Sequence, residues 1–251
     1  MKPIRLLLPC LVLLLSGCTT DKVDPYLGDA PSYIYAKGHT DLQNGNNNDA
    51  LTAYQSLDSQ YPFNAYTKKG DIESVYAYYE NDNPAMSITA ASRYLKVYPG
   101  DENSDYAYYM MGVVDFENGR GFLQKYFPYD MAQHNAPNYT EAYNYFNTLV
   151  QQYPKSPYAS DARRRMIYLN NTLAQYQLNT AQYDYKRGAY VSAINRAQDI
   201  LVHFPTAPQN TEALALIMQA QEKLDLTDLA ASTANILKYN TPNNPALGPK
   251  Q

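Results

Sequence analysis

The chain has 251 residues, with 20 lysines and arginines against 24 aspartates and glutamates, and a formal net charge of −4. This length is enough for one large domain or for an array of repeats. The acidic balance argues against a nucleic-acid partner, because contacts to phosphates require a basic surface.

The first element is a predicted lipoprotein signal peptide over residues 1–17. Lys2 and Arg5 give it a positive start, and the apolar run at residues 6–15 is far shorter than the roughly 20 residues of a membrane-spanning helix. The run ends in Leu-Ser-Gly-Cys, so we expect cleavage before Cys18 and lipid attachment to its thiol. An ordinary secretory signal with an incidental cysteine is the alternative. Loss of Lys2 and Arg5 leaves 18 basic side chains against 24 acidic ones, a mature net charge of −6.

Lipidation of Cys18 with two or three acyl chains would anchor the chain firmly to a membrane. Residue 19 is threonine rather than aspartate. By resemblance to the sorting rule of Gram-negative lipoproteins, this implies the periplasmic face of the outer membrane. Residues 18–32 are polar and contain two prolines, and we expect them to form a tether between the lipid and the folded part. Because cleavage also removes Cys10, no disulfide can form within the mature chain.

A pattern that ends in an aromatic residue and a proline recurs along the rest of the chain. Four copies end at Tyr61-Pro62, Tyr98-Pro99, Tyr153-Pro154 and Phe204-Pro205, and a weaker fifth copy ends at Thr241-Pro242. The residues 4, 7 and 11 positions before each aromatic lie on one helical stripe. The residue at −11 is always small, as is needed where two helices cross closely: Ala50, Ser87, Ala142, Ala193 and, in the fifth copy, Ala230. The proline then ends the helix.

Each of these predicted helices follows another apolar-periodic segment and a turn. In two copies the turn contains glycine, Gly45 and Gly188, which suits a left-handed residue after a helix. Paired helices that end in proline are typical of the tetratricopeptide repeat (TPR). The sequence therefore predicts an all-α fold, an α-solenoid superhelix of about five TPR-like helix hairpins with a concave binding face.

The closing aromatics are 37, 55 and 51 residues apart, which indicates two insertions. We expect units 1 and 2 and the first helix of unit 3 at residues 33–117, an inserted loop of unit 3 at 118–137, and units 3 to 5 at 138–243. A tail follows at 244–251. The second insertion lies within 158–187, where apolar residues recur in steps of three and four. This spacing predicts one continuous helix, with a kinked or broken pair of helices as the alternative.

No pattern in the chain is typical of catalysis or of metal binding. The three histidines lack the spacing of a zinc site, and there is no glycine-rich phosphate loop or Gly-x-Ser-x-Gly motif. We interpret carboxylate pairs such as Asp71 and Glu73 as solvated faces. The basic run at 163–165 is read as a solvated stretch of helix, or alternatively as a contact for an acidic partner. We therefore predict that the protein is not an enzyme and has no cofactor or metal.

Two tyrosine clusters, at 76–79 and 106–109, place aromatic rings next to one another. Adjacent side chains of a helix cannot all face inward, so some of these rings should line a surface. Tyrosine is common in interfaces because it combines a large apolar area with a polar tip.

Several distinctive short segments follow one another along the mature chain. They are Leu15 to Cys18, Ile34-Tyr35-Ala36, Tyr61-Pro62-Phe63 with Tyr66, Val75 to Tyr79, Arg187 to Val191, and Asn195-Arg196. In this order they resemble the BamD family, also called ComL, of TPR lipoproteins in the β-barrel assembly (Bam) machinery. The insert at 118–137 departs most from the family.

The resemblance implies a periplasmic scaffold between an unfolded β-barrel protein and the insertase. In the family the C-terminal units bind the POTRA domain of BamA nearest its barrel, and Arg196 with Asn195 matches the pair expected there, with Arg196 forming an ion pair. The N-terminal units form a groove for the C-terminal β-signal of unfolded outer-membrane proteins, or for an extended segment of another Bam lipoprotein. The residues expected to line it are Tyr61, Phe63, Tyr66 and Tyr79. The alternative is a different TPR lipoprotein scaffold, such as a pilus-secretin pilotin or a cell-wall-linked protein.

Overall fold

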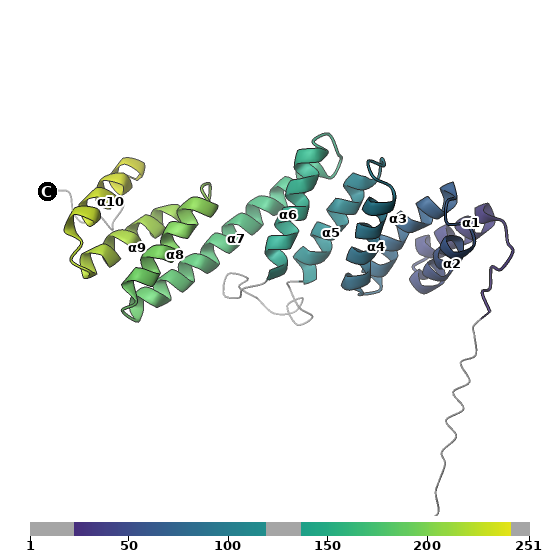
Figure 1. Ribbon diagram of the computed structural model, residues 1–251, viewed down its shortest axis with the longest axis horizontal. Helices are drawn as coiled ribbons and strands as arrows, with labels where there is room; N and C mark the ends of the chain where they lie inside the picture. The colour runs from purple at the N-terminus through teal and green to yellow at the C-terminus, as the bar shows by residue number, and fades with distance from the viewer. Residues whose placement is uncertain (1–22, 119–136, 242–251) are drawn as a thin grey trace, which may run out of the picture.

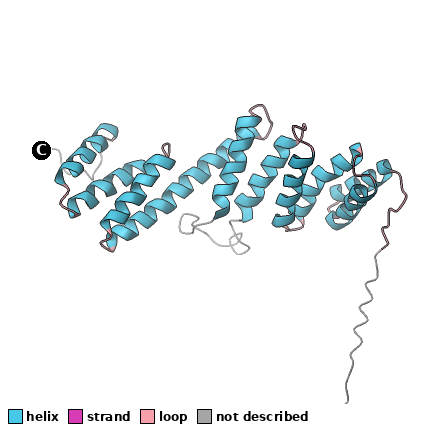
Figure 2. Cartoon of the chain, viewed as in Figure 1, coloured by secondary structure: helices cyan, strands magenta, loops and turns pink. Residues whose placement is uncertain are grey.

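The computed structural model describes residues 23–118 and 137–241 (Figure 1). Within these ranges the chain forms ten α-helices and no strand (Figure 2), so the all-α prediction is confirmed. Consecutive helices pair into five hairpins. The bounds are α1 (Pro31–Gln43), α2 (Asn47–Gln60), α3 (Ala65–Glu80), α4 (Pro84–Val97), α5 (Ser104–Asn118), α6 (Pro137–Gln152), α7 (Ala159–Lys186), α8 (Tyr190–His203), α9 (Asn210–Lys223) and α10 (Thr227–Asn240).

The second helix of each hairpin ends just before the residue that precedes proline, and that residue caps the helix. Tyr61 and Tyr98 lie outside the helical region of the backbone, with φ of −137° and −122° and ψ of 55° and 65°, because a following proline disfavours that region. Each still closes the last turn, since its N–H donates to the carbonyl four residues earlier. Proline also begins three helices, at Pro31, Pro84 and Pro137, where its missing N–H has no cost.

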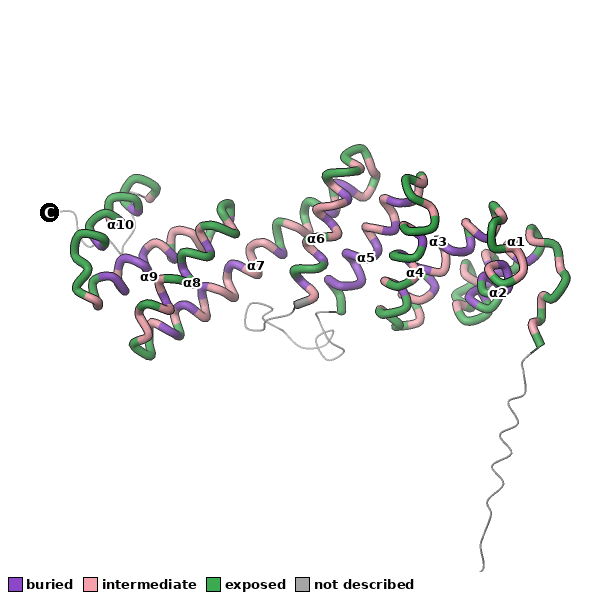
Figure 3. The backbone as a smooth tube through the Cα atoms, viewed as in Figure 1, coloured by how far each residue is buried: buried purple, intermediate pink, exposed green. Residues whose placement is uncertain are grey.

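The residues at −11, −7 and −4 form the buried stripe that their spacing predicts. In the third unit, for example, Ala142, Phe146 and Leu149 are each 0% exposed. The small residue at −11 lets the neighbouring helix approach. The same three positions are buried in the first four units, whereas Ala234 in the fifth is partly exposed, and Figure 3 shows buried segments alternating with exposed ones along the array.

The turns inside the hairpins use left-handed residues. Gly45 and Gly188 have φ of +77° and +80°, as expected for these glycines. Asp82 and Asp225 occupy the same place in the second and fifth hairpins with φ of 55° and 58°. Aspartate is among the residues that tolerate this conformation most readily.

The first helices of neighbouring hairpins lie against one another: α1 contacts α3, α3 contacts α5, and α7 contacts α9. Helix α7 is continuous over 28 residues, so the single-helix interpretation holds and the broken pair does not. Its first half packs in one core cluster with α5 and α6, and its second half packs in another with α8 and α9. The array is therefore extended along one axis, with α7 spanning its middle (Figure 1).

Several predicted segments fall outside the described residues. These are the signal peptide at 1–17, Cys18 and the start of the tether, residues 119–136 of the insert, and the tail at 244–251. No helix in the described ranges is long and apolar enough to cross a bilayer.

Candidate functional site

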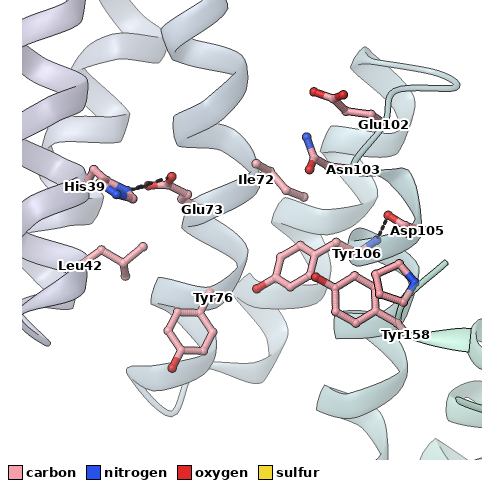
Figure 4. Close-up of a pocket in the computed structure, with 11 residues that line it drawn as sticks. His39, Leu42, Ile72, Glu73, Tyr76, Glu102, Asn103, Asp105, Tyr106 and Tyr158 are labelled. Carbon is pink, nitrogen blue, oxygen red and sulfur yellow. Dashed lines mark hydrogen bonds and ion pairs between the residues drawn. The ribbon is translucent and has the colours of Figure 1, made fainter. Parts of the chain in front are cut away.

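A groove of about 590 Å³ opens on the face formed by the first helices of the N-terminal hairpins (Figure 4). Its walls come from α1, α3, the start of α5, and the loops that precede α5 and α7. The stacking of hairpins thus brings segments that are distant in the sequence around one hollow. A face of this kind is where solenoid proteins bind their partners.

Glu73 on α3 is the polar centre of one wall. Its carboxylate accepts hydrogen bonds from the Tyr35 hydroxyl, at 2.6 Å, and from the Tyr54 hydroxyl, and Nδ1 of His39 lies 3.0 Å from both carboxylate oxygens. Burial, and then the hydrogen bond to Glu73, raises the pKa of the Tyr35 and Tyr54 hydroxyls, so both remain donors at neutral pH. Glu73 therefore ties α1, α2 and α3 together.

The expectation that Asp71 and Glu73 lie on solvated faces is wrong. Asp71 is 7% exposed, accepts a hydrogen bond from the Tyr98 hydroxyl at 2.9 Å, and forms an ion pair with Arg93. Both carboxylates are held between helices because neighbouring helices supply donors to them. The spacing of residues along α3 alone could not predict these hydrogen-bond donors, because they come from other helices.

Aromatic rings form the other wall of the groove. The rings of Tyr106 and Tyr158 lie 5.6 Å apart, and Tyr158 also stacks on Tyr109 at 4.8 Å. Tyr76, which is 39% exposed, lies beside them in Figure 4. Tyr106 comes from α5 and Tyr158 from the loop before α7, so this wall depends on the approach of the third and fourth hairpins.

The charged residues of the groove are acidic. Glu73, Glu102 and Asp105 line it, whereas none of its eleven lining residues is lysine or arginine. Glu102 is exposed and has no hydrogen bond or ion pair with any described residue. One oxygen of Asp105 accepts the N–H of Tyr106 at 2.7 Å, and its second oxygen has no partner in the described part of the chain.

A row of rings extends from the groove toward the first hairpin. The Tyr35 ring lies 5.6 Å from the His39 ring and 5.6 Å from the Tyr66 ring. The ammonium of Lys69 lies 5.6 Å from the centre of the Tyr35 ring and 5.7 Å from that of Tyr66. Lys69 is exposed and pairs with no acidic side chain in the described ranges, which leaves it available to an anion.

None of the four residues predicted to line the groove is among the eleven residues that line it. Tyr66 belongs to the row of rings, and Tyr79 lies 6.2 Å from Tyr76, so both adjoin the groove. Phe63 is 99% exposed in the turn between α2 and α3. Tyr61 packs in the core of the first hairpin and donates its hydroxyl to the carbonyl of Asp29 at 2.9 Å.

Some of the residues that line the groove could be predicted from the sequence. Tyr76 and Tyr106 belong to the two tyrosine clusters, in which some rings were expected to face a surface. Tyr158 and His39 carried no such signal, because their place follows from the packing of other helices around them.

The predicted partner-binding pair lies on α8. Asn195 is exposed and has no partner among the described side chains. Arg196 is also exposed, but its Nε lies 2.9 Å from Asp184 of α7, an intramolecular ion pair that the sequence did not indicate. Two exposed valines, Val191 and Val202, flank the pair on the same helix, with 60% and 71% exposure.

The described residues contain no group of three or more histidine, cysteine, aspartate or glutamate side chains able to hold a metal ion. Cys18, the predicted lipidation site, lies outside the described ranges.

Comparison with known proteins gives a consistent set of relatives. Residues 28–237 match the YfiO family, which is described as an outer membrane lipoprotein. The outer membrane protein assembly factor BamD of Vibrio cholerae serotype O1 is 34% identical over 227 residues, which cover 90% of this chain and 94% of that protein. The same factor of Neisseria meningitidis serogroup B is 35% identical over 247 residues, 96% of this chain and 92% of that protein. Among solved structures, PilF of Pseudomonas aeruginosa is 16% identical, with 86% and 94% coverage and a TM-score of 0.39.

Proposed function

The chain belongs to the YfiO family of outer membrane lipoproteins, and from this we propose that it is a scaffold of the Bam machinery that binds other proteins and catalyses nothing. Its relatives in two bacteria are outer membrane protein assembly factors. The observation that carries the proposal is the tyrosine-lined groove on the stacked first helices, because a preformed hollow of this kind accommodates an extended polypeptide.

The groove and the adjoining row of rings are proposed to receive an extended segment of an unfolded β-barrel outer-membrane protein. The same surface could take an extended segment of another Bam lipoprotein. Tyr66 and Tyr79 flank the groove and Phe63 exposes its whole ring, so these three remain proposed contacts. Tyr61 is proposed to act indirectly, by holding the turn that presents Phe63. Lys69 beside the Tyr66 ring offers a cation to a terminal carboxylate that follows an aromatic residue.

The POTRA domain of BamA is proposed to bind the exposed face of α8. Val191, Asn195 and Val202 are separated by four and seven residues, which places them on one face of this helix. Arg196 lies at the edge of that face, where its guanidinium can donate to Asp184 and to a partner carboxylate together. We propose that Asn195 and Arg196 supply the polar contacts and the valines the apolar ones.

The mature protein is proposed to be anchored by lipid on Cys18 to the periplasmic face of the outer membrane. The residues between Cys18 and Asp24 would then link the lipid to the first hairpin, because residues 24–29 already pack on α2. This places both the groove and α8 in the periplasm, where unfolded barrel proteins and a POTRA domain could reach them.

The contact with BamA is tested by comparing Arg196→Gln with Asp184→Asn. Both substitutions break the ion pair between Arg196 and Asp184 that joins α8 to α7. Asp184 also accepts the hydroxyl of Ser192 on α8 and lies 3.8 Å from Arg187, so Asp184→Asn disturbs the link between the helices at least as much as Arg196→Gln. If Arg196 also binds BamA, Arg196→Gln should lower the amount of BamA that co-purifies with the full lipoprotein severalfold, whereas Asp184→Asn should leave it unchanged. Equal recovery of BamA with the two variants would show that Arg196 only joins the two helices.

A further inference from the structure

One end of the groove combines aromatic rings with unneutralised carboxylates. We call it the acidic pocket and define it by Tyr76, Glu102, Asp105, Tyr106 and Tyr158. Resting on the proposed function, we infer that the acidic pocket binds a lysine or arginine side chain of the polypeptide held in the groove. The inference names a chemical class of segment that the groove selects.

The charges around the acidic pocket favour a cation. Glu73 accepts hydrogen bonds from three neighbours of its own. Glu102 and Asp105 form no ion pair with a described residue, although Lys68 interacts electrostatically with Glu102. The nearby ammonium of Lys68 forms an ion pair with the Asp101 carboxylate at 2.6 Å. Opposite charges attract more strongly in a hollow walled by protein than in open water, because the effective dielectric constant is lower there.

The rings of the acidic pocket favour the same ligand. A guanidinium or ammonium within about 6 Å of a tyrosine ring is attracted by the electron density of the ring face. Tyr106 and Tyr158 lie side by side, and their hydroxyls donate to no described residue, so their oxygens can accept hydrogen bonds from a cation. An aliphatic side chain would use the rings but leave both carboxylates unpaired.

Lys69 and the acidic pocket lie on different sides of α3, although Glu73 also faces α1 through its contacts with Tyr35 and His39. Lys69 lies on the side of α1 with the rings of Tyr35 and Tyr66, and the acidic pocket lies on the side of α5 and α7. A peptide that crosses α3 is best matched when its terminal carboxylate lies near Lys69 and its basic residue lies in the acidic pocket. Charge complementarity of this kind fixes the direction and register of a bound chain.

The test uses the full mature lipoprotein in detergent micelles and fluorescent decapeptides that end in phenylalanine. Each peptide carries one internal arginine, moved stepwise along the chain, or citrulline, its uncharged isostere, at the same position. At the best position we expect arginine to bind about tenfold more tightly than citrulline, as measured by fluorescence anisotropy. The preference should weaken as salt is raised, because the carboxylates are partly exposed.

Two double variants test whether the preference for arginine over citrulline depends on the carboxylates of the acidic pocket. Glu102→Gln with Asp105→Asn should bring the arginine and citrulline affinities together to within about threefold. Glu222→Gln with Asp228→Asn removes the same charge from exposed positions of α9 and α10 and should leave the preference intact. Thermal unfolding of both pairs confirms that each variant is folded.

The possible results separate the inference from the proposed function. If arginine and citrulline peptides bind equally well to the unaltered protein, the acidic pocket does not select a cation, while the peptide-binding groove stands. A preference that survives loss of Glu102 and Asp105 also overturns the inference. If no peptide binds at any position, both the inference and the proposed groove are wrong.

Discussion

Asp115, on α5, is a buried carboxylate that makes no hydrogen bond or ion pair with any described residue. It is 8% exposed. Burial, and then the nearby charge of Glu141, raises the pKa of Asp115 to about 6. Glu73 differs because three neighbours satisfy it. At the scale of single residues, the donors that neighbouring helices bring decide whether a buried carboxylate supports the fold or opposes it.

The pH dependence of stability should report this difference. The folded pKa of Asp115 lies above the unfolded value of 3.8, so the ionised carboxylate destabilises the fold fully above pH 6 to 7 and progressively less as the pH falls through about 6. Asp115→Asn should therefore raise the free energy of unfolding at pH 8 more than at pH 5, by about 1 kcal/mol. Chemical denaturation of the unaltered protein and of Asp115→Asn at pH 8 and pH 5 measures this difference in the free energy of unfolding.

Glu222→Gln is the control, because Glu222 is exposed. Its effect on the free energy of unfolding should be the same at both pH values. An effect of Asp115→Asn that does not change between pH 8 and pH 5 would contradict the unpaired state of this carboxylate.

At the same scale, the sequence could predict which residues are buried better than which residues line the groove. The stripe that includes Ala142 and Phe146 follows from helical spacing and a closing proline, both of which are local. This pattern of helical spacing and a closing proline describes only the second helix of each hairpin. The groove is lined by first helices, whose facing side chains depend on how the hairpins stack. Tyr158 is the extreme case, because it comes from a loop and meets Tyr106 only through tertiary packing.

At the scale of elements, close helix contacts depend on residues without side chains. Gly112 of α5 faces the ring of Phe146 of α6, and a Cβ atom at this glycine would lie 2.5 Å from Cε1 of that ring. In the first unit, the ring of Tyr54 lies between Gly38 of α1 and Gly70 of α3 in the same manner. The turn glycines Gly45 and Gly188 were predicted from local sequence, but these helical glycines were not, because their need for space arises between helices.

Gly112→Ala should destabilise the protein by about 1 to 3 kcal/mol, measured by urea denaturation. The sign is informative, because alanine in place of glycine in an unobstructed helix stabilises it by up to about 1 kcal/mol. Phe146→Leu in the Gly112→Ala background should recover part of the loss by making room for the new methyl group. A stabilised Gly112→Ala protein would contradict the close approach of α5 and α6.

At the scale of the whole molecule, the groove and the α8 face lie in different halves of one extended array. The continuous helix α7 joins them, since its two halves belong to different core clusters. The two proposed binding surfaces are therefore well separated along the array (Figure 1), so the two proposed partners would not compete for one surface. Spacing along the sequence predicted this long helix and the number of hairpins, because both follow from periodicity within the chain.

Site-specific photocrosslinking in growing cells can establish whether the groove receives unfolded barrel proteins. A photoreactive amino acid replaces Tyr76, which is 39% exposed in the groove, or Tyr239, which is 89% exposed on α10. We predict that precursors of β-barrel outer-membrane proteins are captured at position 76 and not at position 239. Capture of no precursor at position 76, or equal capture at the two positions, would contradict the account.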